Sequence, residues 1–176
     1  SLLDCESDQL EPNALIQAIL KAPVDLLYNG GIGTYVKASS QSHAEANDRG
    51  NDVLRVDGRD LRCKVIAEGG NLGFTQLGRI EYAAHGGRIH TDAIDNSAGV
   101  DCSDHEVNIK ILLGRLIASG DLTLKQRNEI LASMTDEVGL LVLRDNELQT
   151  QDISLEFEQS LSLLPVHTRL MQALDP

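Results

Sequence analysis

The sequence predicts an α/β fold in which a parallel sheet with flanking helices is followed by a helical C-terminal segment. Three short apolar runs, at residues 24–28, 63–67 and 88–94, end in turns of small residues and predict three buried strands. Helical patterns separate these runs, and strands joined through helices pair in parallel. Beyond residue 120 the apolar residues keep a helical spacing. We divide the chain into a loose lead-in (1–11), a sheet-containing segment (12–120) and a helical subdomain (121–176).

The remaining elements follow from helical spacing and from turn residues. Helices are expected at 12–22, 75–84, 122–143 and 153–164, the last closed by Pro165. Thr34 is expected to cap a short helix, and residues 53–56 are expected to form a small hairpin with Leu61 around Asp57-Gly58. The stretch between these two features, 39–52, is polar and predicts a loop.

Composition excludes several classes of function. Fifteen basic against 27 acidic residues give a net charge of −12, which disfavours binding to nucleic acid or to an anionic membrane. No apolar run approaches the roughly 20 residues of a membrane span. The cysteines Cys5, Cys63 and Cys102 lack CxxC spacing, which disfavours a disulfide framework and favours the cytoplasm. The histidines lack metal-ligand spacing as well, so no metal site is expected.

All three predicted strands end in turns of small and polar residues, at 29–33, 68–73 and 96–103. Ligands of open parallel sheets bind beyond the carboxyl ends of the strands. Glycine lets a planar cofactor approach the backbone, and asparagine offers a donor and an acceptor to a ribose or a carboxamide. Any single turn is explained by the ordinary preference of loops for Gly and Asn. Three such turns at one sheet edge favour a binding site.

The first two turns leave specific alternatives. Gly31-Ile32-Gly33 begins like a dinucleotide fingerprint, but Val36 stands at the third glycine position and no acidic residue ends a strand about 20 residues later. We therefore expect this turn to contact a ribose or a nicotinamide rather than a diphosphate. Glu68 in the second turn is either a solvated loop residue or a hydrogen-bond acceptor for a ligand.

The third turn leads into a helix that is expected to begin near Ser103. Ser103 with Glu106 three residues later fits a capping box. A serine at a helix start is also well placed to bind a carboxylate, and the two roles can coexist. The nearby acidic residues Asp101 and Asp104 suit a helix N-terminus and need no further explanation.

Three segments, residues 24–37 (VDLLYNGGIGTYVK), 67–73 (AEGGNLG) and 95–103 (DNSAGVDCS), closely resemble the large NAD-specific bacterial glutamate dehydrogenases. The likeness runs from about Pro12 to Leu113 and continues more faintly through the helical tail. It implies a partial Rossmann-like sheet, the second half of a dinucleotide-binding domain, with NAD as cofactor. Gly70 and Ser97-Ala98-Gly99 depart from the motifs of the related shorter enzymes, as does Leu72-Gly73-Phe74-Thr75, which lacks their proline.

The resemblance also implies a site. Asn71 and Asn96 would lie near the nicotinamide and its ribose, while Val100 and Ser103 would line the pocket for the side-chain carboxylate of glutamate. The full set of residues expected to bind the cofactor is Asn29, Gly30, Gly31, Glu68, Gly69, Gly70, Asn71 and Asn96.

The resemblance places the catalytic Lys and Asp and the diphosphate-binding loop upstream of Ser1. We therefore expect no catalytic residue in this chain, which looks cut from something longer and would be inactive alone. The parent enzyme would convert glutamate and NAD to 2-oxoglutarate, ammonia and NADH, and is expected to be a homo-oligomer. Two alternatives stay open: a non-catalytic nucleotide-sensing module, or a helical assembly domain whose apolar surface includes Leu140, Leu141, Leu143, Leu161 and Leu164.

Overall fold

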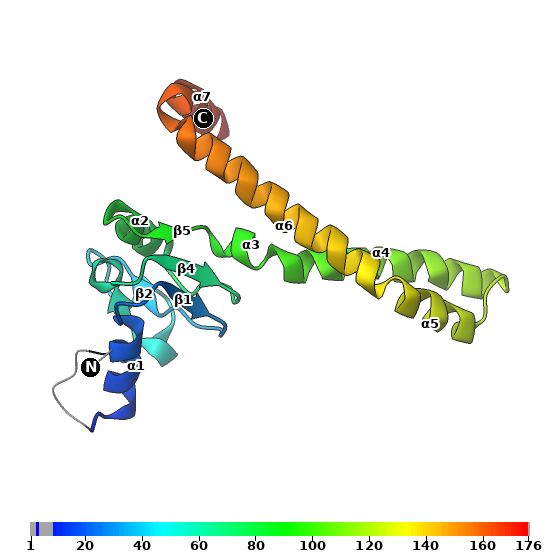
Figure 1. The fold of residues 1–176 in the computed structure, drawn as a ribbon, viewed down its shortest axis with the longest axis horizontal. Helices are drawn as coiled ribbons and strands as arrows, with labels where there is room; N and C mark the ends of the chain where they lie inside the picture. The colour runs from blue at the N-terminus through cyan, green and yellow to red at the C-terminus, as the bar shows by residue number, and fades with distance from the viewer. Residues whose placement is uncertain (1–2, 4–8, 176) are drawn as a thin grey trace. The chain divides into compact units, whose positions relative to one another are not determined.

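A computed structural model of the chain describes residues 3 and 9–175 (Figure 1). The chain forms two compact units, Ser1–Ser97 and Ala98–Pro176. The expected lead-in at 1–11 falls mostly outside the described residues. The fold is α/β with a small parallel sheet, and most of the described residues are helical.

A three-stranded parallel sheet forms the centre of the first unit (Figure 1). Its strands β1 (Leu26–Asn29), β4 (Val65–Glu68) and β5 (Arg88–Ile89) are neighbours in that order, and Asn29 lies opposite Glu68. The helices α1 (Pro12–Leu20) and α2 (Gln76–Ala84) confirm the predicted alternation of helix and strand. Thr75 caps α2 by accepting a hydrogen bond from the backbone N–H of Gly78.

Two predictions between β1 and β4 are wrong. Thr34 caps no helix but precedes strand β2 (Val36–Lys37), and no hairpin surrounds Asp57-Gly58. Instead, β3 (Val56–Asp57) pairs in parallel with β2 and leads into a 3₁₀ turn, Gly58–Asp60. The polar loop at 39–52 is present and includes a second 3₁₀ turn, Arg49–Asn51. The partner of β3 lies far upstream, where a local turn signal does not reach.

The third strand is shorter than predicted. β5 ends at Ile89, and a short helix α3 (Asp92–Asp95) precedes the long helix α4 (Ser97–Ser119). Ser103 therefore lies inside α4 rather than at its start, and the capping-box interpretation is wrong. The small residues at 97–99 continue into the helix instead of forming a tight turn.

The core of the first unit is aliphatic with two aromatic rings. Its buried members are Val36, Val56, Leu61, Cys63, Ile66, Phe74 and Tyr82. The Tyr82 hydroxyl donates to the Cys63 carbonyl at 2.9 Å, which satisfies its polar end. β1 does not share this burial, because it lies at the edge of the sheet and leaves Leu26 and Tyr28 more than half exposed. The prediction of a buried first strand is thus wrong.

Four helices build most of the second unit: α4, α5 (Leu124–Ser133), α6 (Thr135–Glu158) and α7 (Ser160–Leu174). Gly120, with a φ of +84°, ends α4 in the left-handed conformation that glycine adopts at no steric cost. Thr123 and Gln126 form a capping box at the start of α5.

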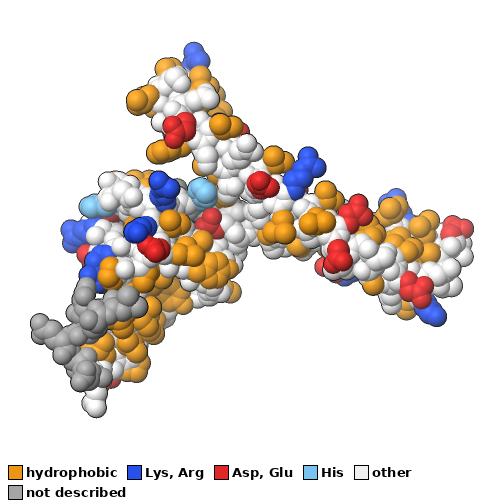
Figure 2. Space-filling view, viewed as in Figure 1, with side chains coloured by type: hydrophobic (Ala, Val, Ile, Leu, Met, Phe, Trp, Pro, Cys, Tyr) orange, Lys and Arg blue, Asp and Glu red, His pale blue; other side chains and the backbone are white. Residues whose placement is uncertain are grey.

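The later boundaries in this unit differ from the prediction. The helix expected at 122–143 is interrupted at Met134, and the next helix runs on to Glu158. Pro165 lies inside α7 rather than after a helix, at the cost of one backbone hydrogen bond. Figure 2 shows hydrophobic side chains exposed along these helices. None of the described helices is long and apolar enough to cross a membrane.

Candidate functional site

Two of the three turns predicted to form a site, 29–33 and 68–73, lie together at the carboxyl edge of the sheet, and of the third predicted turn, 96–103, only Asn96 joins them because the following residues belong to α4. The backbone N–H groups of Gly69 and Gly70 donate to the Asn29 carbonyl at 2.9 and 3.3 Å. The Asn96 side chain donates to the Gly70 carbonyl at 3.0 Å and also to the Asn71 side chain. We call this group of segments, 29–33, 68–73 and 92–96, the carboxyl rim.

Glycines of the rim allow the turns to contact one another. A Cβ atom on Gly70 would lie 2.5 Å from the Gly31 carbonyl oxygen, and one on Gly73 would lie 2.0 Å from Asn29 Nδ2. Real Cβ atoms do not approach so closely, so neither position accepts a side chain without displacing its neighbour. These two glycines are therefore explained by packing between the turns themselves.

Glu68 is buried in an ion pair. Its side chain has no exposed area, and Arg79 of α2 donates to both of its carboxylate oxygens at 2.9 and 3.0 Å. Burial raises the pKa of the Glu68 carboxyl, and the Arg79 guanidinium opposes that shift. The interpretation of Glu68 as a solvated loop residue is thus wrong, and its carboxylate is already bound by Arg79. In this position Glu68 holds the rim in place through its ion pair with Arg79.

Two aspartates of α3 complete this support, and sequence reasoning missed both. Asp95 Oδ2 accepts from the Glu68 backbone N–H at 2.9 Å, and Asp92 Oδ2 accepts from that of Leu72 at 2.7 Å. Asp92 also lies 3.3 Å from Arg79, so one guanidinium links α2, β4 and α3. The sequence did offer a signal for the role of Arg79, because a glutamate at the end of a buried strand requires a cationic partner.

Leu72 has a positive φ of 59°, an unusual conformation for a leucine. Besides the contact of its N–H with Asp92, its carbonyl accepts from the Thr34 hydroxyl at 2.8 Å. The Thr34 backbone N–H in turn donates to Asp48 at 2.8 Å. The strained residue is therefore held from both sides, as expected where backbone strain persists.

Asn29 carries an unsatisfied donor at the rim. Its Nδ2 atom is buried and has no hydrogen-bond partner among the described residues. Its Oδ1 atom accepts only a long bond of 3.4 Å from the Gly31 N–H. A buried donor without an acceptor costs roughly 1–3 kcal/mol. The rim therefore contains one buried polar atom whose hydrogen-bonding capacity no described residue satisfies.

A groove of about 820 Å³ opens beside the rim and is lined by Gly33, Thr34, Asn71, Leu72, Arg79 and Asp92, among others. Another cavity, of about 640 Å³, lies at the opposite end of the strands, next to Cys63, Lys64 and Arg88. Parallel sheets bind ligands at the carboxyl ends of their strands, which favours the groove. Among the residues expected to bind the cofactor, Asn71 lines it.

The wall of the groove opposite the rim carries two carboxylates. Hydrogen bonds from the backbone and side chain of Ser42 lower the pKa of Glu45. The Asn51 side chain and the Thr34 backbone N–H lower the pKa of Asp48 in the same way. Both groups are ionised at neutral pH, so the groove suits a neutral or cationic group better than a diphosphate.

The residues expected to bind glutamate lie in the second unit. Val100 and Ser103 are both exposed on α4, three residues apart and hence on one face of the helix. The same helix also brings Asp101 and His105 close to Asp145 of α6, a grouping that the sequence did not predict.

Comparison with known proteins agrees with the resemblance found in the sequence. Residues 1–156 match the family described as bacterial NAD-glutamate dehydrogenase, catalytic domain. The chain is 58% identical over 172 residues to the NAD-specific glutamate dehydrogenase of Pseudomonas aeruginosa and 62% identical over 148 residues to that of Halomonas elongata. That of Mycobacterium tuberculosis is 57% identical over 165 residues.

These matches cover 98%, 84% and 94% of the chain, which spans only 11%, 9% and 10% of the length of the relatives. The family match extends over both units, from the sheet through most of α6. By this match and these identities, the chain belongs to the bacterial NAD-glutamate dehydrogenase family.

Proposed function

We propose that this chain forms the nicotinamide-facing part of an NAD-dependent glutamate dehydrogenase. The parent enzyme would oxidise glutamate to 2-oxoglutarate and ammonia, and the first unit would be part of its Rossmann-like domain in the cytoplasm. The observation that carries the proposal is the meeting of two turns, 29–33 and 68–73, with Asn96 at the carboxyl rim, where Asn29 keeps a donor without a partner among the described residues. Membership of the family supplies the class of reaction.

In this proposal the asparagines of the rim orient the cofactor. The buried amide of Asn29 donates to an acceptor on the ribose or the carboxamide, while Asn71 and Asn96, already joined to each other, fix the position of that half of the nucleotide. Gly30, Gly31, Gly69 and Gly70 supply backbone next to it. The carboxylates of Glu45 and Asp48 favour the positive charge of an oxidised nicotinamide ring.

Once bound, the nicotinamide supplies a hydride acceptor for the Cα atom of glutamate. The residues of this chain contribute orientation rather than proton transfer, and Val100 and Ser103 would contact the side-chain carboxylate of the substrate. Positioning of this kind contributes substantially to rate without any acid or base. The Lys and Asp that transfer protons would lie elsewhere in the longer polypeptide, so this chain alone would be inactive.

The test is Asn29→Ala in the intact enzyme. The KM for NAD should rise about 3- to 10-fold, the equivalent of one hydrogen bond. Stability should not fall, because the substitution removes a donor that lacks a partner among the described residues. Asn128→Ala, on exposed α5, is the matched control and should change neither property. An unchanged KM for NAD in Asn29→Ala would contradict the proposal.

A second role, in assembly, is supported by the apolar surface of the helices. Leu140, Leu143 and Leu161 are 69%, 66% and 90% exposed, although leucines of a soluble helix usually face a core. We propose that α6 and α7 cover this surface by association within a homo-oligomer of the parent enzyme. This role is compatible with the first, because the rim lies in the other unit.

A further inference from the structure

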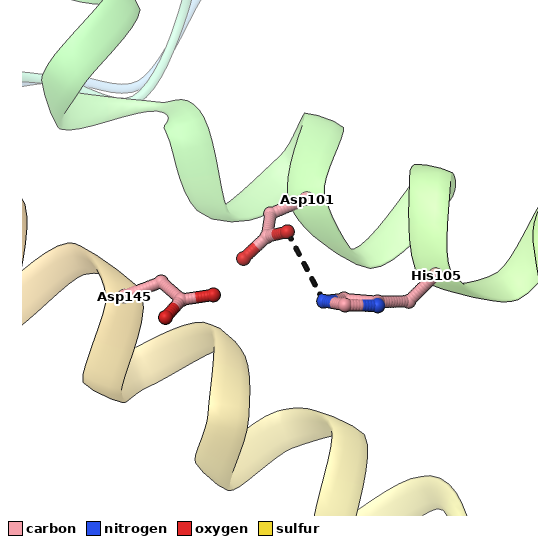
Figure 3. Close-up of side chains that lie close together, drawn as sticks. All are labelled: Asp101, His105 and Asp145. Atoms are coloured by element: carbon pink, nitrogen blue, oxygen red, sulfur yellow. Dashed lines mark ion pairs between the residues drawn. The ribbon is translucent and has the colours of Figure 1, made fainter.

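Three potential metal ligands meet between two helices of the second unit (Figure 3). Asp101 and His105 come from α4, and Asp145 comes from α6. Each offers one ligand atom, and these three atoms lie within 4.8 Å of one another. The carboxylates and the imidazole point toward a common space in Figure 3.

The geometry is close to that of a bound metal ion. His105 Nε2 lies 3.2 Å from Asp101 Oδ1. Two ligands at about 2.0–2.1 Å from a tetrahedral zinc ion lie roughly 3.4 Å apart, so this pair needs almost no movement. Asp145 would have to approach by about 1 Å, which a side-chain rotation on a helix surface allows.

The charges favour a cation at this place. Asp101 and Asp145 present two carboxylates to one small space, and like charges repel unless a cation lies between them. Asp145 has no ion-pair partner within the described part of the chain. The ion pair of His105 with Asp101 therefore leaves one carboxylate without a counter-charge.

The donor set indicates the class of metal. One imidazole nitrogen and two carboxylate oxygens, with water in a fourth position, suit zinc or cobalt. Magnesium and calcium prefer sites made of oxygen alone. The spacing of four residues between Asp101 and His105 places both ligands on one face of α4, as in helical metal sites.

The position on α4 separates this site from the proposed substrate contacts. At about 100° per residue, Asp101 and His105 lie about 40° apart around the helix axis. Val100 and Ser103 lie at least about 100° from either of them. A metal here would not reach the substrate face, and its effect would be to join α4 to α6.

A metal ion that links α4 to α6 would help hold the two helices together, because few other side chains are buried between them. The buried hydrophobic residues described in the second unit are Leu113 of α4 and Val142 of α6. We propose that Asp101, His105 and Asp145 bind one divalent transition-metal ion, zinc or a close analogue, that holds α4 against α6. The proposal is independent of the nicotinamide site.

The test uses the intact enzyme, stripped of metal with EDTA and titrated with Co²⁺ and Zn²⁺. We expect His105→Ala and Asp145→Asn each to bind one metal equivalent fewer than the wild type at micromolar metal, with an affinity at this site reduced about 10-fold or more. The visible absorption of four-coordinate Co²⁺ should fall by the same equivalent. Asp104→Asn, exposed on the same helix and outside the cluster, should match the wild type.

Two further measurements guard against a trivial loss of structure. Asp145→His keeps a ligand at the same place and should bind the equivalent at least as tightly as the wild type. Zn²⁺ should raise the melting temperature of the wild type more than that of His105→Ala. Equal metal stoichiometry in the wild type, His105→Ala and Asp145→Asn would overturn the proposal, and so would loss of the equivalent in Asp145→His.

Discussion

The unit that ends at Ser97 buries nine of the described hydrophobic side chains, whereas the unit that begins at Ala98 buries two. Five polar or charged residues are buried in the described part of the chain, among them Arg55, Glu68 and Arg79, and all five belong to the first unit. The sheet-containing unit is thus stabilised by its own core and by internal ion pairs. The helical unit has few buried side chains and keeps most of its described leucines exposed. The difference suggests that one unit fixes a site and the other offers a surface.

Arg79→Ala should produce the largest effect, because it leaves the Glu68 carboxylate buried without its cation. Breaking a buried ion pair by removing one partner costs about 3–5 kcal/mol. We expect urea unfolding at pH 7 to show this loss, with NAD binding by the intact enzyme weakened as well. The loss should shrink at acid pH, since burial raises the pKa of Glu68 and a protonated carboxyl needs no counter-charge.

The control for this prediction is the double variant Arg79→Met with Glu68→Gln. It removes both charges while keeping the approximate volume, and it should recover much of the lost stability. If Arg79→Ala alone were as stable as the wild type, the ion pair would not be what holds the rim.

Ile66→Ala and Leu161→Lys together test the comparison between the units. Ile66 is 2% exposed, so its truncation should lower the free energy of unfolding by about 2–5 kcal/mol. Leu161 is 90% exposed, so its replacement should change that energy by less than about 0.5 kcal/mol. Sedimentation of the intact enzyme should show weaker association for Leu161→Lys only. If Leu161→Lys lowered the stability and Ile66→Ala weakened the association instead, the two units would have the opposite roles.

Glu81→Gln should lower the stability less than Arg79→Ala or Ile66→Ala does, and its effect should depend on pH. Burial tends to raise the pKa of Glu81, but hydrogen bonds from Ser39 and the Arg59 backbone outweigh it and lower the pKa below its usual value. A carboxyl whose pKa is lower in the folded state stabilises the fold above its unfolded pKa, and this stabilisation disappears as the pH falls through the folded pKa.

Glu81→Gln should therefore be less stable than the wild type by about 1 kcal/mol at pH 7. The two proteins should converge as the pH falls below about 4.5, the ordinary pKa of the carboxyl. Urea midpoints measured between pH 3 and 7 would show this convergence. A difference that stayed constant across the range would assign the effect to packing rather than to charge.

The sequence predicted the elements whose signals are local. The helices that begin at Pro12 and Gln76 and the strands around Leu27 and Ile66 lie where the sequence placed them, within a few residues. Two of the rim segments, 29–33 and 68–73, were also located, because glycine and asparagine mark the ends of strands. The resemblance to the family added the class of cofactor, which no residue pattern in this chain reveals.

Contacts between distant segments could not be predicted in the same way. The pairing of Val36 with Val56 replaces a predicted hairpin, because a parallel partner leaves no signature in a short window. α2 exposes Leu77 and Ile80 and buries Arg79, so its apolar side chains did not reveal the buried face. The approach of Asp145 to His105 likewise depends on how two helices pack, which spacing along one helix does not show.

The position of β1 at the sheet edge affects the solubility of the isolated polypeptide. β1 pairs with β4 on one side, and no other described strand of its sheet lies on the other. An uncovered edge with exposed Leu26 and Tyr28 is a template on which a second chain can add a strand, and such edges promote aggregation. A lysine at Leu26 would act as a gatekeeper and should improve the solubility of the isolated polypeptide.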